Sequence, residues 1–281
     1  MNDIINLKTW LIKNLFLLSI GCTVAMGRVI YVDTDATGTN DGSTWENAYK
    51  YLQEALADAS SMAKPVEIRI AQGVYRPNQG LVAIPEFDWR TTTFQMLNGV
   101  ILKGGYAGLG EPDPNARDIE LYETVLSGDL YGNDVDVNNP ADLLDEPTRA
   151  ENSYHVVTGS GTDNSTVLDG FTITAGNANG PLLGEHPNFD LRLRYGAGMS
   201  NVSGSLTLTN CTFAGNSADY GDALACDSHN HEHPSILELI NSILWDNGNE
   251  IWNSDGSAII ISYSDIQGGH DGVYDRYEAV I

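Results

Sequence analysis

The chain has 281 residues, including 29 Gly and 24 Asn but only 5 Lys, and its formal net charge is −24. A hydrophobic content of 42% can build a core, which excludes wholesale disorder, and the Gly- and Asn-rich composition favours a turn-rich β fold. A surface this acidic repels phosphate backbones and anionic lipid, so the composition argues against nucleic-acid and membrane-surface partners and favours cations.

The opening of the chain is typical of a secretory signal peptide that ends at residue 27. Lys8 and Lys13 precede an apolar run over residues 15–22, and the small-residue frame Ala25-Met26-Gly27 follows. The uncharged stretch is shorter than the ~18–20 residues that a membrane-spanning helix requires. We therefore expect a secreted or outer-surface protein without a transmembrane segment after cleavage.

Residues 28–65 are predicted to form a strand and one capping helix. The strand is expected at Arg28–Val32, and Ser43 with Glu46 has the spacing of a capping box. Apolar residues at helical spacing then continue to residues 60–61, namely Trp45, Ala48, Tyr49, Leu52, Ala55, Leu56 and Ala59. We expect this helix to cover the exposed edge of the first strands.

Short apolar strands are predicted next at residues 66–70, 99–103 and 124–127, and the second half of the chain shows a repeat. Four aligned segments place the following residues in one column: Ile173, Phe213, Leu244 and Ile266. Their separations are 40, 31 and 22 residues, so a basic turn of about 22 residues leaves two insertions as loops. Asn210 and Asn241 share a column between strands, where a residue tolerant of left-handed backbone angles is expected.

A turn of this length cannot bury its apolar face alone, whereas stacked turns can. The sequence therefore predicts an all-β solenoid, a parallel β-helix over residues 66–281, with turns spaced ~4.8 Å apart. A β-sandwich is the alternative, and it would require hairpin turns. The segment after Gly269 contains no helix or polar cap, which predicts either a C-terminal continuation or a docking chain.

Two sets of motifs carry a resemblance to known families. Gly196-Ala-Gly-Met199 and Phe213-Ala-Gly-Asn216 resemble the GGA(I/L) and FxxN repeats of polymorphic outer-membrane proteins. The run from Tyr31 through Trp45 to Tyr75 is similar to the opening of secreted right-handed parallel β-helix proteins of the pectate-lyase-like superfamily. The resemblance covers most of residues 28–269 and implies the fold and its handedness. It leaves the activity open, since this superfamily includes lyases, hydrolases, adhesins and structural proteins.

Three charged residues in the longest insertion are candidates for catalysis. Asp190, Arg192 and Arg194 alternate, so in an extended chain all three would face the same way. A calcium-assisted polysaccharide lyase needs acidic ligands and a base, often Arg or Lys. A solvated loop whose charges pair locally is the alternative, and no local lyase signature can be matched residue by residue.

Two acidic stretches are candidate calcium sites. Asp33, Asp35 and Asp41 belong to a run that partly resembles a calcium loop, although Thr44 stands where the closing Glu is expected. A turn that feeds the helix is the alternative. A second excursion, residues 128–148, favours either weak calcium binding or a solvated acidic loop. Its acidic residues are Asp129, Asp134, Asp136, Asp142 and Asp145.

The remaining candidate ligands are histidines, tryptophans and cysteines. His229, His231 and His233 would lie on one face of an extended chain and could clamp Zn or Cu, or they belong to an exposed loop. Trp245 and Trp252 are candidates for stacking on sugars. Trp245 lies next to the interior column, so its ring is expected to face outward, whereas a place in the core is the alternative for Trp252. Two cysteines remain in the mature chain, Cys211 and Cys226, and they either pair or lie buried as thiols.

Together these features predict a secreted or cell-surface protein that binds carbohydrate, either a polysaccharide or a cell-envelope component, or another surface partner. The rival prediction is a calcium-assisted uronate lyase. A third reading is a β-helix that serves as a structural spacer. The sequence leaves open whether the protein is an enzyme, and Ca²⁺ is the one cofactor expected apart from the possible Zn or Cu clamp of the histidines.

Overall fold

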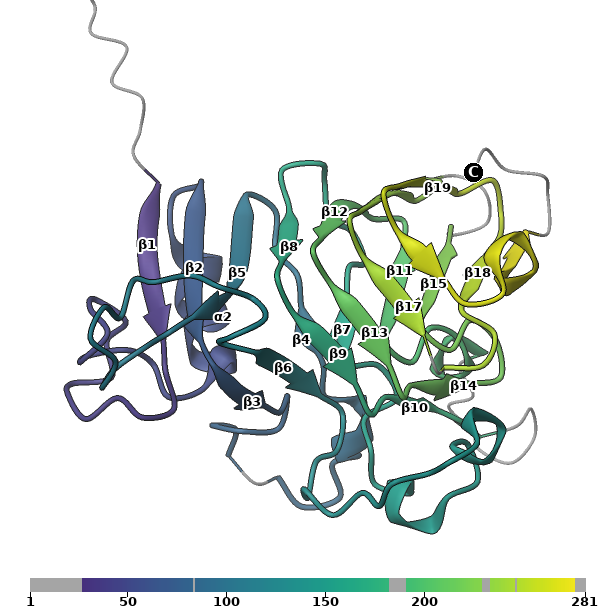
Figure 1. The fold of residues 1–281 in the computed structure, drawn as a ribbon, viewed down its shortest axis with the longest axis horizontal. Coiled ribbons are helices and arrows are strands. Elements are labelled where there is room, and N and C mark those ends of the chain that lie inside the picture. Colours follow the sequence, from purple (N-terminus) through teal and green to yellow (C-terminus); the bar gives the residue numbers. More distant parts are fainter. Residues whose placement is uncertain (1–26, 83, 182–190, 229–232, 246, 276–281) are drawn as a thin grey trace, which may run out of the picture.

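The computed structural model describes residues 27–82, 84–181, 191–228, 233–245 and 247–275 (Figure 1). The predicted signal peptide, apart from Gly27, lies outside these residues. The same holds for Asp190, His229 and His231.

Three long sheets form the body of the molecule, and every pairing between their strands is parallel. Sheet A has the order β1 (Arg28–Val32), β2 (Val66–Ala71), β5 (Val100–Tyr106), β8 (Val167–Asp169), β12 (Ser205–Thr209), β16 (Ile236–Ile240) and β19 (Ala258–Ser262). Sheet B has the order β3 (Gly73–Tyr75), β6 (Thr124–Ser127), β9 (Thr172–Thr174), β13 (Thr212–Ala214), β17 (Ile243–Trp245) and β20 (Asp265–Ile266). Sheet C has the order β4 (Phe94–Gln95), β7 (Val157–Thr158), β11 (Met199–Val202), β15 (Leu224–Asp227), β18 (Ile251–Asn253) and β21 (Val273–Asp275).

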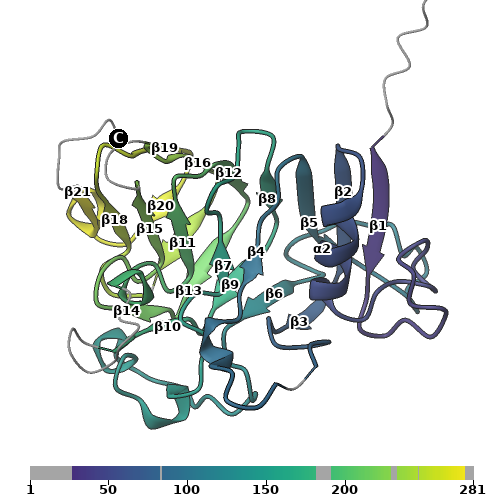
Figure 2. The same cartoon turned by 180° about the vertical axis from the view of Figure 1, so that it is seen from behind.

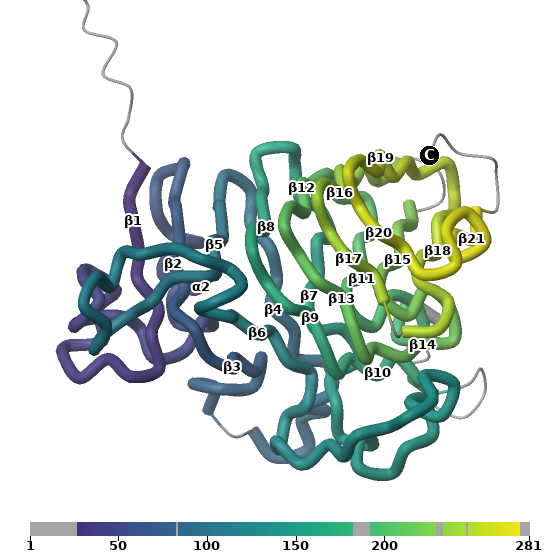
Figure 3. Tube along the Cα trace, in the orientation of Figure 1, coloured from purple at the N-terminus to yellow at the C-terminus, as the bar shows by residue number. Residues whose placement is uncertain are grey.

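The chain passes from sheet A to sheet B to sheet C and then returns to sheet A one level further along (Figure 3). A short pair, β10 (Asn177–Ala178) with β14 (Ser217–Ala218), lies between sheets B and C in two of these coils. Five short 3₁₀ helices interrupt the loops: η1 (Trp89–Thr91), η2 (Pro140–Asp142), η3 (Pro147–Arg149), η4 (Leu191–Arg194) and η5 (Gly269–Gly272). The arrangement is consistent with the predicted parallel β-helix. The sandwich alternative does not fit, because the described strands contain no antiparallel pair.

The strand registers confirm the column that the repeat predicts. Phe213 lies opposite Ile173 on one side and Leu244 on the other, and Leu244 lies opposite Ile266. Phe213, Ile173 and Leu244 are fully buried in one continuous core that fills the space between the three sheets. The insertions of different length therefore leave the register of the coils unchanged.

The corner between sheets A and B requires a left-handed residue in successive coils. Asn210 and Asn241 have φ values of 53° and 49°, as predicted, and Gly170 and Tyr263 occupy the same corner with φ values of 83° and 54°. The Asn241 side chain donates a hydrogen bond from Nδ2 to Asn210 Oδ1 at 2.6 Å. The amides therefore stack along the corner and satisfy one another between coils.

The predicted helix exists but begins later than expected. Helix α2 spans Leu52–Ser61. Residues 43–48, where the first two turns of the helix were expected, form bends and a hydrogen-bonded turn instead. The Tyr49 N–H donates to Tyr31 O, which holds this part of the chain extended against β1. Trp45 packs with Tyr31 and Tyr106 outside the main core, so its helical spacing was coincidental. The predicted capping box is therefore wrong.

In the first coil, helix α2 takes the place that strands of sheets B and C have in later coils. The helix contacts β1, β2 and β4 (Figure 2). Its buried residues belong to the main core, and they are Leu52, Ala55, Leu56 and Ala59. The helix thus closes the apolar interior at the first coil.

Cys211 and Cys226 are free and buried. Cys211 lies in the corner between β12 and β13, whereas Cys226 lies in β15 with Asn201 and Asn253 as its neighbours in register. Burial raises the pKa of each thiol to about 12, so neither thiol ionises at neutral pH. Of the two alternatives, buried thiols are the one that the structure contains.

A search of the described helices finds none with the length and apolar character to cross a membrane.

Candidate functional site

Four aromatic rings line up along the outer face of sheet C, and we call them the aromatic ladder: Tyr195, Tyr220, Trp252 and Tyr274. Tyr195 stacks on Tyr220 with ring centroids 4.9 Å apart. Trp252 meets Tyr220 at 4.7 Å and stacks on Tyr274 at 4.1 Å with only 7° between the ring planes. Tyr220 and Tyr274 are 41% and 49% exposed, so the ladder is a surface feature.

The coils bring these rings together as two pairs at equivalent positions, and the contact between Tyr220 and Trp252 joins the pairs. Trp252 and Tyr274 are register partners in β18 and β21, and Tyr195 bridges to Tyr220. Gly221, with φ of 64°, passes directly beside the Trp252 backbone, since a Cβ placed on it would lie 2.7 Å from Trp252 Cβ. Because Gly221 has no side chain, Trp252 can come close enough for its indole to contact Tyr220.

The exposed side of the ladder borders a cleft of about 360 Å³. Tyr220, Trp252 and Tyr274 supply its aromatic wall, and polar groups of Asp219, Asn249 and Asp271 surround it. Aromatic faces combined with a few carboxylate and amide groups form a surface that can hold a ligand with both C–H faces and hydroxyl groups.

Only one of the two tryptophans proposed as sugar-binding residues belongs to this cleft. Trp252 lies in its wall. Trp245 is 43% exposed on the outer face of sheet B, where its register partner in the preceding coil is Ala214. The ring of Trp245 faces outward as predicted, but at a different face of the molecule.

The three tyrosines of the ladder were not predicted from the sequence. A signal existed in the repeated Tyr-Gly pairs at 195–196 and 220–221, each at the start of the segment that enters sheet C. Aligning Tyr274 with Trp252 required knowledge of the loop lengths between coils.

A second depression, of about 550 Å³, follows the corner between sheets A and B. Asn210, Asn241 and Tyr263 contribute to its lining, together with the carboxylates of Glu120, Glu123 and Asp265. The floor is internally bonded, because Asn210 Nδ2 donates to Asp169 Oδ1 at 2.7 Å and Arg117 pairs with that same oxygen at 2.9 Å. This groove is acidic, and it lacks the stacked aromatic wall of the cleft beside sheet C.

The two arginines proposed as catalytic bases are not in an extended segment. Arg192 and Arg194 lie in η4, where residues two apart point in different directions instead of sharing a face. The Arg194 guanidinium forms an ion pair with Asp219 and donates to Gly180 O. Arg194 is thus committed to holding the insertion against the start of the aromatic cleft.

The first predicted calcium run serves as a turn. Asp33 is buried and accepts hydrogen bonds from the N–H groups of Asp35 and Leu109. Burial raises the pKa of Asp33 above its usual value, partly offset by those two hydrogen bonds. Asp41 accepts from the N–H of Ser43 and from the Thr39 hydroxyl. Asp41 thus stabilises its own loop, whereas Asp33 also links its loop to the one that contains Leu109. Asp35 of this run is exposed, and so is His233 of the histidine motif.

The second predicted calcium stretch is partly assembled into a cluster. Within the described residues, one group of three acidic side chains has ligand oxygens close enough to share a cation, and its members are Asp129, Asp134 and Glu151. Asp136, Asp142 and Asp145 of the same excursion are exposed and lie outside the group. Glu151 was not predicted, because it follows the excursion in sequence and joins the cluster only through the fold.

Comparison with protein-family models, with curated proteins and with solved structures finds no match.

Proposed function

We propose that this chain is a secreted right-handed parallel β-helix of the pectate-lyase-like class that binds carbohydrate through the aromatic ladder. The parallel sheets with consecutive coils and the signal-like opening support the class and the compartment. The aromatic ladder and the polar residues around its cleft support carbohydrate as the ligand.

The observation that carries the proposal is the cleft beside Trp252 and Tyr274. A sugar ring exposes C–H groups on its faces and hydroxyl groups at its rim. The aromatic wall offers apolar contact for those faces, and Asn249 and Asp271 offer amide and carboxylate partners for hydroxyl groups. A ladder several coils long matches an extended oligosaccharide better than a single small sugar.

The charge of the site favours neutral glycans. Asp271 borders the cleft and the whole chain carries −24, so a uronate polymer would be repelled even though Asp219 is paired with Arg194. The structure favours the lyase alternative less, because Arg194, one of its two candidate bases, forms an ion pair with Asp219.

The test is a titration of the protein with neutral oligosaccharides of cellulose, xylan, mannan and chitin types, with polygalacturonate as the anionic comparison. Tryptophan fluorescence and calorimetry would report binding at Trp252. We expect at least one neutral oligosaccharide to bind, and Tyr274→Ala to weaken its affinity about tenfold, which corresponds to about 1.4 kcal/mol.

Tyr263→Ala is the matched control, since Tyr263 is an 89% exposed tyrosine of the same coil that lines the acidic groove instead. Affinity lost in Tyr263→Ala but kept in Tyr274→Ala would move the site to that groove. Equal binding by both variants and the unmodified protein would contradict a role for the ladder.

A further inference from the structure

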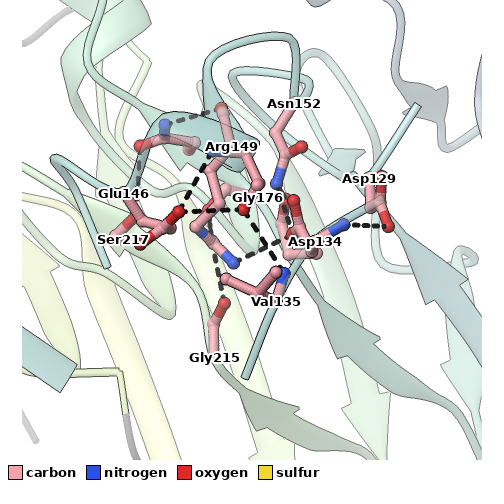
Figure 4. Close-up of polar contacts among 12 residues, drawn as sticks. Asp129, Asp134, Val135, Glu146, Arg149, Asn152, Gly176, Gly215 and Ser217 are labelled. Atoms are coloured by element: carbon pink, nitrogen blue, oxygen red, sulfur yellow. Dashed lines mark hydrogen bonds and ion pairs between the residues drawn. The ribbon is translucent and has the colours of Figure 1, made fainter. Parts of the chain in front are cut away.

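The excursion between β6 and β7 folds back so that its two ends meet. Asp129 lies two residues after β6, and Glu151 lies six residues before β7. With Asp134 between them in sequence, the three side chains bring their carboxylate oxygens within 4.8 Å of one another (Figure 4 shows Asp129 and Asp134). Asp129 is held rigidly, since Oδ1 accepts from the N–H groups of Gly132 and Asn133.

A buried amide oxygen without a partner lies at this cluster. Asn152 is fully buried, and its side chain points toward Asp134 (Figure 4). Its Nδ2 donates to Asp134 Oδ2 and to Ala175 O, both at 2.8 Å, whereas its Oδ1 has no hydrogen-bond donor among the described residues. A buried amide oxygen without a partner costs roughly 1–3 kcal/mol.

Two further acceptor atoms share this condition. Asp134 Oδ1 and Glu151 Oε1 are also buried and have no donor within the described part of the chain. The unmet acceptors are therefore oxygens of three neighbouring residues, and Arg149 Nε is an unmet donor beside them. A bound cation is a partner that can satisfy several such oxygens at once.

The cluster also has an excess of negative charge, which a cation could balance. Three carboxylates face one guanidinium, that of Arg149, whose Nη1 lies 3.2 Å from Asp134 Oδ2. Its Nη2 donates to Gly176 O and Gly215 O, so Arg149 is fixed to the following coils. Two negative charges remain uncompensated.

We propose that Asp129, Asp134 and Glu151, together with the amide oxygen of Asn152, form a calcium site that fastens the excursion to the body of the coils. All four ligands are oxygens, which suit a hard divalent cation and not zinc or copper. The irregular set of carboxylates and an amide suits the variable coordination of Ca²⁺ better than the octahedral demand of Mg²⁺. Asp134 retains 15% side-chain exposure, so solvent reaches the site.

The site has a structural role separate from carbohydrate binding. It would link both ends of the excursion, while Arg149 links that excursion to the coils of β9 and β13. A cation that binds only the folded chain stabilises it in proportion to its occupancy.

The experiment uses the purified chain, freed of metal with EDTA and dialysed into 150 mM KCl, with CaCl₂ as the probe. We expect calorimetry to give one site with a Kd of about 10⁻⁴ to 10⁻³ M, as in other extracellular modules. At a calcium concentration of 100 times Kd, the thermal midpoint should rise by about 5 °C or more. MgCl₂ should compete weakly.

Asp134→Asn is the decisive variant. Its amide oxygen can still accept from Arg149 and Asn152, while its Nδ2 would donate toward the oxygens that now lack partners. We expect the variant to lose the calcium-dependent shift while its metal-free midpoint stays equal or rises. Asp136→Asn is the matched control, since Asp136 is an exposed carboxylate two residues away, and it should retain the full shift.

Glu151→Gln gives an independent measurement that does not depend on how Asp134→Asn folds. A calcium isotherm of unit stoichiometry that both variants abolish, and that Asp136→Asn preserves, would support the site. Absence of binding, or binding that both variants retain, would overturn it. The carboxylates would then share a proton in place of a cation, or calcium would bind only the acidic surface.

Discussion

Asp222 is a carboxylate that is almost completely buried in the corner that leads into sheet C. Its two oxygens accept from the N–H groups of Ala218 and Asn249, and the carboxylate of Glu250 lies nearby. Burial is the main cause that raises its pKa to about 7, and the charge of Glu250 acts in the same direction. In the folded protein Asp222 is therefore mostly protonated below about pH 7.

This shift predicts that the calcium-free protein becomes more stable on mild acidification. Between pH 4 and pH 7 the folded chain holds a proton on Asp222 that the unfolded chain has released, so the free energy of unfolding falls as the pH rises. From pH 5 to pH 7 the loss should be about 2 kcal/mol. Urea unfolding at several pH values measures it, and Asp222→Asn should flatten the slope. Asp271→Asn, at an exposed position, should leave the slope unchanged, and an equal effect of both variants would contradict the assignment.

At the scale of elements, the helix shows where sequence patterns succeed and fail. The amphipathic spacing from Leu52 to Ala59 predicts a buried face correctly, because every apolar residue of that face meets the core. The same spacing extended back to Trp45 is misleading, since Tyr49 pairs with β1 instead of continuing the helix. A local period cannot reveal a pairing between residues that are far apart in sequence.

The corrected helix start makes a direct prediction about stability. Leu56→Ala should lower the free energy of unfolding by about 2–5 kcal/mol, because Leu56 is 5% exposed against the core of the first coils. Ser43→Ala should change it by less than about 0.5 kcal/mol, whereas removal of a genuine cap costs roughly 0.5–2 kcal/mol. Urea denaturation of both variants checks this, and a large effect of Ser43→Ala would restore the capping box.

Across the whole molecule, the sequence predicts the coils better than the sites. The column through Ile173, Phe213 and Leu244 could be found because each coil repeats the same buried position, whatever the loop length. The acidic cluster of Asp129, Asp134 and Glu151 could not be found in full, because Glu151 comes close to Asp129 only in the folded excursion. A buried position that repeats in each coil can be recognised in the sequence. Contacts between residues of an insertion can be recognised only in the folded chain.

Stacking of coils predicts that energetic coupling extends only to neighbours. Phe213→Ala and Ile173→Ala, at facing positions in adjacent coils, should each cost about 2–5 kcal/mol, and their double mutant should depart from additivity by at least about 0.5 kcal/mol. Phe213→Ala combined with Ile30→Ala should be additive within about 0.5 kcal/mol, since β1 and β13 belong to coils far apart in the stack. Denaturant titrations of the five variants close both cycles. Coupling of equal size in both would mean that the interior responds as one globular core and not as a column of coils joined only to their neighbours.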